Sequence, residues 1–351
     1  MKRILIISLL ITLLALGFSI LIALAMPLPS ARMRGQAPSS PSPSDTASPS
    51  PSAAVPTGRF LDDTIAVTVA FPDEVRTLPL GEYLVGVVGG EMPASFEMEA
   101  LKAQAVAART YTLTRILASN KPEHPDADVC TDHTHCQAYL TAEELTERWG
   151  EDFNAYYQKI IDAVRYTDGV CLLYGGAPIE AVFHSSSAGK TASSAEVWGK
   201  PLPYLVSVES FETADDVPNY LSSVTVSHAD FKSTILRAYP NAALGDNPEE
   251  WIGAKTLSPS GRIDTVIIGG IGIPGTELRT LFGLRSTAIE IELTETDVVF
   301  FTTGYGHGVG LSQYGANAMA RAGSGYEDIL MWYYQGASLG SVKEVFAGQD
   351  G

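Results

Sequence analysis

The feature that most constrains the fold is a pair of helices joined by a corner at Glu91 and Pro93. Residues 80–89 carry apolar side chains at a helical spacing, and two glycines follow as a helix stop. Pro93 blocks direct continuation, and Ser95 can cap a second helix that we expect to run to about residue 119. Because this second helix is rich in alanine, we expect it to pack closely against its neighbours.

Glu91 is the candidate catalytic residue at this corner. Its place just past a helix carboxyl end, among apolar neighbours, favours the neutral acid and hence proton donation near neutral pH. The amino end of the next helix acts in the opposite direction, so the pattern leaves the net pKa shift open. The alternative is a carboxylate that only caps the helix.

The amino terminus carries an apolar run over residues 4–26, preceded by Lys2 and Arg3. A bilayer span needs about 20 apolar residues, whereas the apolar part of a secretory signal has about 7–15. We therefore expect residues 1–26 to be a retained single-pass anchor, with the amino terminus in the cytoplasm and the rest of the chain outside. The alternative is a cleaved signal peptide, because Ala-Leu-Ala at 23–25 resembles a cleavage site.

Residues 27–57 are rich in proline, serine and alanine and predict an extended spacer, which leaves residues 58–351 as the extracytoplasmic domain. The first 57 residues contain four basic side chains and one acidic side chain, for a net charge of +3. The whole chain carries −17, so the remainder carries −20. Such a charge argues against nucleic acid as a partner, since its binding depends on cations that neutralise phosphates.

Helical and strand-like stretches alternate irregularly after residue 58, which predicts the α+β class. Several strand-like segments fall between residues 206 and 300 and indicate a β-rich subdomain or insertion. The chain then predicts two final helices, at 313–322 and 326–334, after a glycine-rich loop. We expect a mixed, mostly antiparallel β region packed with the helical corner.

Residues 183–208 form a first candidate binding region, in which a polar loop follows an apolar strand. Hydroxyl-rich loops beside aromatic faces suit sugar rings, which offer an apolar face and many hydroxyls. The alternative is an ordinary loop with aromatic side chains in the core. The candidate substrate-binding residues here are His184, Ser186, Thr191, Trp198 and Tyr204.

A second candidate region is the loop GYGHGVGLSQYG, residues 304–315, which opens a helix. The spacing of its glycines does not fit the dinucleotide pattern G-x-G-x-x-G. We expect the glycines to let the backbone approach a ligand closely and to present His307 at the loop tip. Gln313 and Tyr314 lie at the helix start, where hydrogen-bond donors point outward.

A third cluster combines cysteine and histidine within EHPDADVCTDHTHCQAY, residues 123–139. Four such ligands suffice for a tetrahedral zinc, which here would be structural and would pin a loop beside the corner. The alternative is a redox-labile pair or a disulfide between Cys130 and Cys136. The candidate ligands are His124, Cys130, His133, His135 and Cys136.

Taken together, the motifs resemble the stage II sporulation protein D family, which also includes amidase-enhancer proteins. They follow the family's order and cover most of residues 81–339. The motifs that carry the resemblance are EYLVGVVGGEMP with ALKAQAVAARTY, HCQAY, FHSSSAGKT with VWGKPLPYL, SGRIDTVIIGG with ELRTLFGLRST, and GYGHGVGLSQYGANAMARAG with ILMWYYQGASL.

The resemblance implies a membrane-anchored lytic transglycosylase of the bacterial cell wall. It would cut peptidoglycan glycan strands between N-acetylmuramic acid and N-acetylglucosamine, preferring strands whose stem peptides an amidase has removed. It would act in sporulation, during engulfment, with a partner amidase and further membrane proteins. The family's catalytic glutamate corresponds to Glu91, and a zinc set of some members corresponds to His124, Cys130, His135 and Cys136.

One essential carboxyl agrees with this chemistry, because the sugar's own C6 hydroxyl replaces the water that glycosidases activate. Glu91 would donate a proton and then accept one. We expect His184, Thr191, His307 and Gln313 to orient the sugar and Trp198 or Tyr204 to stack on a ring. Arg109 pairs either with a sugar carboxylate or with an internal acid. The rival hypotheses are a non-catalytic wall-binding activator of an amidase and a zinc hydrolase.

Overall fold

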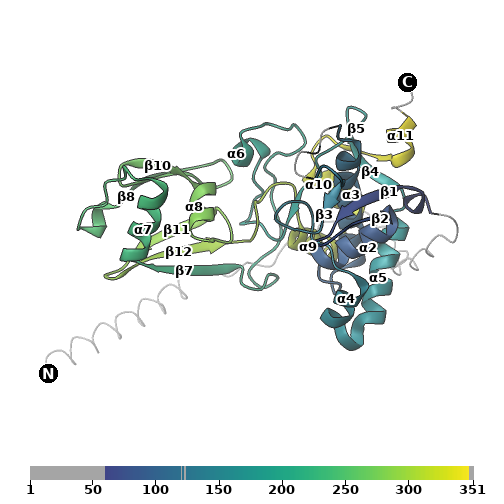
Figure 1. Cartoon of the computed structure of the whole chain (residues 1–351), viewed down its shortest axis with the longest axis horizontal. Helices are drawn as coiled ribbons and strands as arrows, with labels where there is room; N and C mark the ends of the chain where they lie inside the picture. Colours follow the sequence, from purple (N-terminus) through teal and green to yellow (C-terminus); the bar gives the residue numbers. More distant parts are fainter. Residues whose placement is uncertain (1–59, 120, 122–123, 348–351) are drawn as a thin grey trace, which may run out of the picture. The chain divides into compact units, whose positions relative to one another are not determined.

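The computed structural model describes residues 60–119, 121 and 124–347 (Figure 1). The expected anchor at residues 1–26 and the expected spacer at 27–57 lie outside the described residues. Of the helices in the described part, none is both long enough and apolar enough to cross a membrane. The described residues combine helices with mostly antiparallel sheets, so the predicted α+β class is confirmed.

Two large hydrophobic cores divide the described residues into an α-rich lobe and a β-rich lobe, and a small third cluster around Leu113 and Val342 belongs to the α-rich lobe. In Figure 1 the α-rich lobe lies at the right and the β-rich lobe at the left. The first part of the α-rich lobe contains η1 (Asp62–Thr64), β1 (Ala66–Ala70), β2 (Val75–Pro79), α2 (Leu80–Glu91), α3 (Met98–Leu117), β3 (Val129–Cys130), α4 (Ala142–Trp149), η2 (Gly150–Asp152) and α5 (Phe153–Tyr166).

The remaining α-rich elements come from both sides of the β-rich segment. They are β4 (Val170–Tyr174), β5 (Ala177–Pro178), β6 (Phe183–His184), α6 (Ser194–Trp198), β13 (Leu311–Ser312), α9 (Gln313–Arg321), α10 (Tyr326–Tyr333), β14 (Ser338–Ser341) and α11 (Val342–Ala347). The β-rich lobe contains β7 (Leu221–Ser227), α7 (His228–Ala238), η3 (Pro248–Glu250), β8 (Ile252–Leu257), β9 (Ile263–Ile268), β10 (Ile271–Pro274), α8 (Gly275–Leu281), β11 (Ile289–Leu293) and β12 (Asp297–Thr303).

The sheets are small and local. In the α-rich lobe the strand orders are β2-β1-β3, β14-β4-β5 and the parallel pair β13-β6. In the β-rich lobe they are β10-β9-β8 and β11-β12-β7, both antiparallel. The parallel pair joins the two candidate binding regions, because Leu311 pairs with Phe183 and Ser312 with His184.

Helix α3 is the centre of the α-rich lobe. Its 20 residues include 14 that are buried, and five of these are alanines. Small side chains let α2, α5, α9 and α10 all pack against it, as the sequence predicted. The helix has no side-chain cap: Ser95 lies in the preceding turn, and Glu97 takes the cap position, so the prediction that Ser95 caps this helix is wrong.

Helix α2 continues through the two glycines that were expected to stop it and ends at Glu91. Packing explains the difference. A side chain at Gly89 would lie 3.0 Å from Leu145, and one at Gly90 would lie 3.2 Å from the Ala138 backbone. The glycines therefore admit α4 and the segment around Ala138 to the surface of α2, and the extra turn places Glu91 at the helix end.

Candidate active site and metal cluster

The Glu91 carboxylate is held by two segments that are distant in sequence. Its Oε1 accepts a hydrogen bond of 2.7 Å from the backbone N–H of Ala138, and its Oε2 accepts one of 3.0 Å from the amide of Gln313. Ala138 closely follows the cysteine- and histidine-rich loop, and Gln313 is the first residue of α9. The side chain at the corner is therefore fixed in direction.

Burial raises the pKa of Glu91 above its ordinary value. The hydrogen bonds from Ala138 and Gln313 and the charge of His133 oppose this effect, but desolvation is the largest contribution. The direction that the sequence left open is thus toward the neutral acid. A carboxyl with a raised pKa is suited to donate a proton near neutral pH.

Glu91 opens into a pocket of about 400 Å³. One side of it is aromatic: Trp149 and Tyr156 pack edge to face, with ring centroids 5.8 Å apart, and Tyr314 also lines the space. An acid, an amide and aromatic faces around one cavity are typical of carbohydrate sites. The lining residues are Glu91, Met92, Pro93, Ala94, Ser95, Arg148, Trp149, Tyr156, Ser185, Gln313 and Tyr314.

Arg148 and Trp149 reach the pocket because of how α4 begins and ends. Thr141 and Glu144 form a capping box at the start of α4, and Gly150, with a φ of 53°, ends the helix. The Arg148 guanidinium donates hydrogen bonds to the carbonyls of Gly89 and Gly90, which fixes α4 to the end of α2.

Arg148, Trp149, Tyr156 and Ser185 also line the pocket, although no motif in the sequence predicted it. Trp149 ends α4 and Tyr156 lies on α5, so their shared face results from the packing of two helices and has no periodic signal in the sequence. Of the predicted substrate-binding residues, only Gln313 and Tyr314 lie in the pocket with Glu91.

The glycine-rich loop approaches protein backbone and not an open ligand space. Gly304, Gly306, Gly308 and Gly310 all have positive φ. A side chain at Gly310 would come within 2.0 Å of the Val182 carbonyl, and one at Gly304 within 2.7 Å of the Ser186 carbonyl. The expectation that these glycines make room for a ligand is therefore corrected: they seat the loop on the segment that contains β6.

The two candidate histidines are bound within the protein. His184 contacts the Val309 carbonyl through Nδ1 at 3.1 Å and the Ser187 hydroxyl through Nε2 at 2.6 Å. His307 accepts from the Val309 N–H at 3.0 Å and has a further hydrogen bond with the Phe183 backbone. Both nitrogens of each ring are engaged, so neither histidine is placed to orient a sugar.

Burial also keeps these histidines neutral. It lowers the pKa of His184 well below its usual range, with a further contribution from His307. Burial and the nearby Arg279 lower the pKa of His307 to about 4. Neutral rings with satisfied nitrogens hold the glycine-rich loop against β6.

Three other predicted substrate-binding residues are buried outside the pocket. Thr191 is fully buried and bonds the backbone of Val208, and Tyr204 is 8% exposed with its hydroxyl on the Glu180 N–H. Ser186 is 2% exposed, and its hydroxyl has no partner among the described residues. Of the predicted sugar-stacking pair, only Trp198 offers an exposed ring, beside His307, but it does not line the pocket.

The sequence allowed Arg109 to pair either with a sugar carboxylate or with an internal acid, and in the structure it pairs with an internal acid. Its side chain is fully buried and forms an ion pair with Asp62, with a shortest distance of 2.7 Å. The remaining donors bond the Val164 and Val170 carbonyls and the Thr167 hydroxyl. Arg109 therefore joins η1, α3 and α5, and its assignment to substrate binding is corrected.

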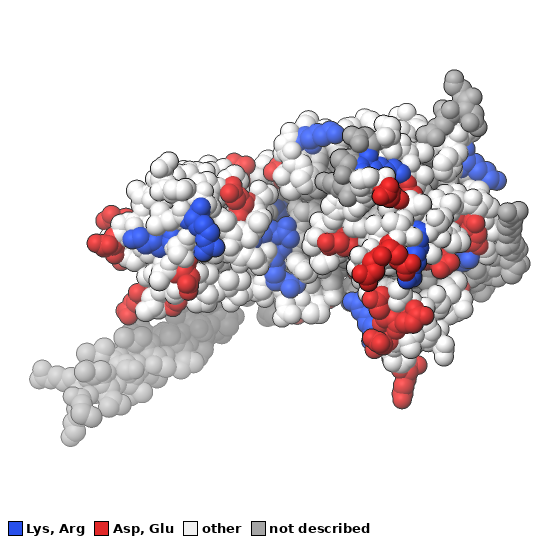
Figure 2. Space-filling model, viewed as in Figure 1, with Lys and Arg blue, Asp and Glu red and all other residues white. Residues whose placement is uncertain are grey.

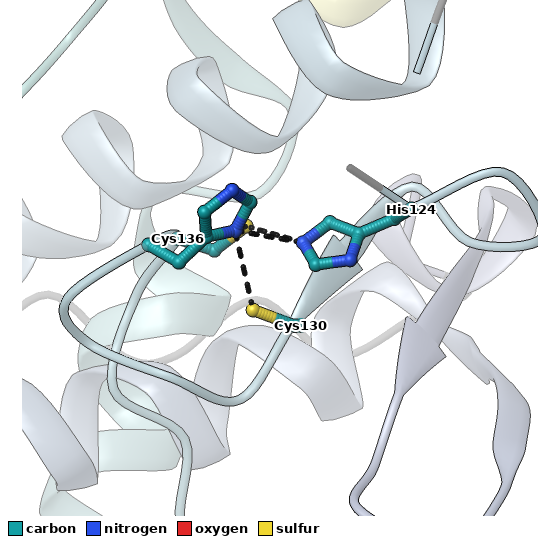
Figure 3. Close-up of side chains that lie close together, drawn as sticks. His124, Cys130 and Cys136 are labelled. Atoms are coloured by element: carbon teal, nitrogen blue, oxygen red, sulfur yellow. Dashed lines mark hydrogen bonds between the residues drawn. The ribbon is translucent and has the colours of Figure 1, made fainter. Parts of the chain in front are cut away.

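The four expected metal ligands lie together, although they are spread along the loop from His124 to Cys136. Figure 3 shows the His124 ring with the Cys130 and Cys136 sulfurs close to it. The ligand atoms of His124, Cys130, His135 and Cys136 all lie within 4.8 Å of one another. His133 is not in this group, and its side chain is largely exposed.

The distances fit a tetrahedral zinc. Tetrahedral bonds of about 2.0–2.3 Å place neighbouring ligand atoms about 3.3–3.8 Å apart. His135 Nδ1 lies 3.5 Å from the Cys130 sulfur and 3.4 Å from the Cys136 sulfur, and His124 Nε2 lies 3.6 Å from the Cys136 sulfur. The 2.7 Å distance between His124 Nε2 and His135 Nδ1 is shorter than this range. The three cysteines are free thiols, so the disulfide alternative is not formed in this structure.

The loop that carries the cluster also holds Glu91. Directly after Cys136, the Gln137 amide bonds Tyr83 on α2 and Thr112 on α3, at 3.3 and 3.1 Å. Ala138 then donates to Glu91. A metal at the cluster would hold this loop in position and, through it, the hydrogen bond from Ala138 to Glu91.

The chain resembles known proteins over most of the described residues. The family model described as Stage II sporulation protein matches residues 72–174. Stage II sporulation protein D of Bacillus subtilis is 37% identical over 266 residues, which are 76% of this chain and 75% of the relative. The protein of the same name from Bacillus amyloliquefaciens is 38% identical over the same shares.

A relative named amidase enhancer, from Bacillus subtilis, is 31% identical over 307 residues. The match covers 74% of this chain but 40% of that relative, which is therefore a longer protein. The two stage II sporulation protein D relatives match about three quarters of this chain and three quarters of their own length. Together with the matching family model, this identity confirms the resemblance found in the motifs. The chain belongs to the stage II sporulation protein D family.

Proposed function

We propose that this protein is a peptidoglycan lytic transglycosylase that cleaves glycan strands between N-acetylmuramic acid and N-acetylglucosamine, in sporulation or wall remodelling. The observation that carries the proposal is Glu91, a carboxyl with a raised pKa, fixed by two hydrogen bonds and open to an aromatic-walled pocket. Membership in a family named for sporulation supports the biological setting.

In the proposed reaction, Glu91 as the neutral acid protonates the glycosidic oxygen, and the bond from C1 of the muramic acid to that oxygen breaks. The C6 hydroxyl of the same sugar then attacks C1, and the Glu91 carboxylate takes the hydroxyl proton. A 1,6-anhydro ring forms, no water is consumed, and the acid is regenerated. One carboxyl thus serves both steps, in contrast to glycosidases, which use two.

The other pocket residues would position the sugar. The Gln313 amide holds one carboxylate oxygen of Glu91 and the Ala138 N–H holds the other, so the orientation of the group toward the pocket is fixed. Trp149 and Tyr156 would receive the apolar face of a ring. A zinc ion at the cysteine and histidine cluster would be structural, since it would hold the loop that contains Ala138 and would not contact the pocket.

The test is Glu91→Gln in the full-length protein. The amide oxygen of glutamine can still accept from Ala138, and Gln313 can rotate its amide to meet the new N–H₂, so we expect the fold to persist. Release of anhydro-disaccharides from amidase-treated sacculi, followed by mass spectrometry, should fall by roughly 10²–10⁴-fold. Glu97→Gln, the same change at an exposed position near the pocket, is the matched control and should retain activity.

The second candidate is a non-catalytic, wall-binding activator of an amidase. The similarity to the relative named amidase enhancer favours it. Under this alternative, Glu91→Gln would stimulate a partner amidase as well as the unchanged protein does, and no anhydro product would form with either. We further propose that residues 1–26 anchor the domain outside the cell, within reach of the glycan, the amidase and other engulfment proteins.

A further inference from the structure

One sequence motif has no part in the pocket: ELRTLFGLRST, residues 277–287. It supplies Arg279 on α8 and Arg285 just after it, and both guanidinium groups act on Tyr305 in the glycine-rich loop. The Cζ of Arg285 lies 4.0 Å from the centre of the Tyr305 ring. The Arg279 charge interacts with the same side chain. Tyr305 is 40% exposed, so this cluster of three side chains reaches the surface.

The two arginines lack anionic partners. Within the described part of the chain, neither guanidinium lies within ion-pair distance of a carboxylate. Among the described residues, the one side-chain hydrogen bond of Arg279 goes to the Leu284 carbonyl. The Arg285 guanidinium donates none to the described residues, and its buried Nε has no partner there.

Unpaired, partly buried cations are unexpected in this chain, because it has 40 acidic and 23 basic residues. Any of the surplus carboxylates could have been placed beside them. Figure 2 shows Lys and Arg side chains between the two lobes, while Asp and Glu gather on the lower part of the α-rich lobe. Partly desolvated guanidinium groups favour a bound anion, with carboxylate as the best geometric match.

Backbone hydrogen bonds connect the cluster with residues that line the pocket. Ser186 and Tyr305 exchange two backbone hydrogen bonds, of 3.1 and 2.9 Å, and the preceding Ser185 lines the pocket. Ser185 in turn accepts from the backbone N–H of Tyr314, another lining residue. Arg285 is near enough to Tyr314 for its charge to act on that hydroxyl. The cluster is thus one residue along the chain and one backbone pairing away from a residue that lines the pocket.

We propose that Arg279, Arg285 and Tyr305 form a second subsite, which binds the carboxylate of an acidic sugar in the strand that occupies the pocket. The inference rests on the proposed function, since it takes its ligand from the same glycan. The guanidinium groups bind the carboxylate, and the exposed Tyr305 ring contacts the sugar. The subsite would distinguish a sugar with a free carboxylate from one whose carboxylate is blocked as an amide.

The test measures binding and does not depend on cleavage. Soluble glycan strands free of stem peptides are prepared in two forms, one with free carboxylates and one with the carboxylates converted to methylamides. Calorimetry then compares the affinities of the two forms for the full-length protein carrying Glu91→Gln. We expect free-carboxylate strands to bind about tenfold more tightly, equivalent to about 1.4 kcal/mol. Adding Arg285→Gln should reduce the difference to less than threefold, and Arg285→Lys should restore part of it.

Arg285→Gln should not disturb folding, because the side chain makes no hydrogen bond within the described residues. Arg237→Gln, the same charge change at an exposed position on α7, is the matched control and should keep the tenfold difference. Equal affinity for both strands before the arginine is changed, or an unaltered difference after Arg285→Gln, would overturn the subsite. If the protein with Glu91 intact released no anhydro products from amidase-treated sacculi while the binding difference was as expected, only the proposed reaction would be overturned.

Discussion

Glu91 and Glu212 are two largely buried carboxylates tied to the start of the same helix, α9. Gln313 donates to Glu91, and the adjacent Ser312 hydroxyl donates to Glu212. Glu212 also accepts from the Ser187 N–H and the Ser210 hydroxyl, is 4% exposed and does not line the pocket. From the part of the chain that the structure describes, Glu91 accepts two hydrogen bonds, and it faces the pocket.

The comparison shows that burial alone does not identify a reactive carboxyl. Glu212 has donors from three segments, all turned inward, and Gly315 leaves the space for it: a side chain there would lie 2.7 Å from its Oε2. Such a group organises the fold. Glu91 retains an open side, so its proton can reach a bound substrate.

The largest effect that would test this contrast is the loss of stability in Glu212→Ala. The substitution leaves the buried Ser187 N–H without an acceptor and removes the charged acceptor of the Ser210 and Ser312 hydroxyls, so we expect the free energy of unfolding to fall by about 3 kcal/mol. Urea unfolding of the full-length protein measures it. Glu209→Ala, at an exposed position, is the control, and equal midpoints for both variants would show that Glu212 does not hold these segments together.

Metal removal should have the next largest effect. If zinc binds the folded protein only, then at a free concentration 100 times its Kd it stabilises the fold by about 2.7 kcal/mol. A chelator should therefore lower the unfolding temperature, and Cys136→Ser should abolish that response. Cys171→Ser, a change at a buried thiol outside the cluster, is the control and should still respond. An unfolding temperature unaffected by chelator and by added zinc would argue against a structural metal.

The sequence predicted the helical corner with Glu91 just past the first helix, because helix periodicity is a local property. Residue types predicted a metal cluster among five cysteines and histidines, and the family resemblance selected the four that lie together. The sequence did not predict Trp149 and Tyr156, because they meet Glu91 only after α4 packs on the two glycines of α2.

The histidines show a different limit of sequence analysis. A histidine between glycines looks exposed in the sequence, but His307 is enclosed because the glycines bring its loop onto β6. A glycine that admits a ligand and a glycine that admits another strand have the same local signature. Tertiary contacts are needed to distinguish these two kinds of glycine. They are also needed to identify Asp62 as the partner of Arg109.

A smaller effect is expected from Gln313→Ala. The Gln313 amide lowers the pKa of Glu91, so its loss should raise that pKa further. The acid form starts the proposed reaction, and activity falls as pH rises through this pKa, so the alkaline fall of kcat/KM should move to higher pH. A hydrogen bond worth about 1 kcal/mol corresponds to about 0.7 pH units.

The profile is measured on amidase-treated strands. Gln158→Ala removes an exposed amide from α5 and should leave the profile unchanged. A shift to lower pH with Gln313→Ala would mean that the amide stabilises the neutral form of Glu91 and would contradict the role assigned to it.

The smallest effect concerns stability and distinguishes the two carboxylates without a substrate. Because burial raises the pKa of folded Glu91 above its unfolded value, the stabilisation that comes from its protonation is fully present below the unfolded pKa. It is lost as pH rises through the folded pKa, at about 1.4 kcal/mol for each unit between the two values.

Glu91→Gln cannot ionise, so the variant should gain stability relative to the unchanged protein between acidic and neutral pH. Urea unfolding at several pH values measures this difference, with Glu97→Gln as the control. A relative loss of stability toward neutral pH would mean that the fold stabilises the Glu91 anion, which would remove the physical basis for its role as the acid.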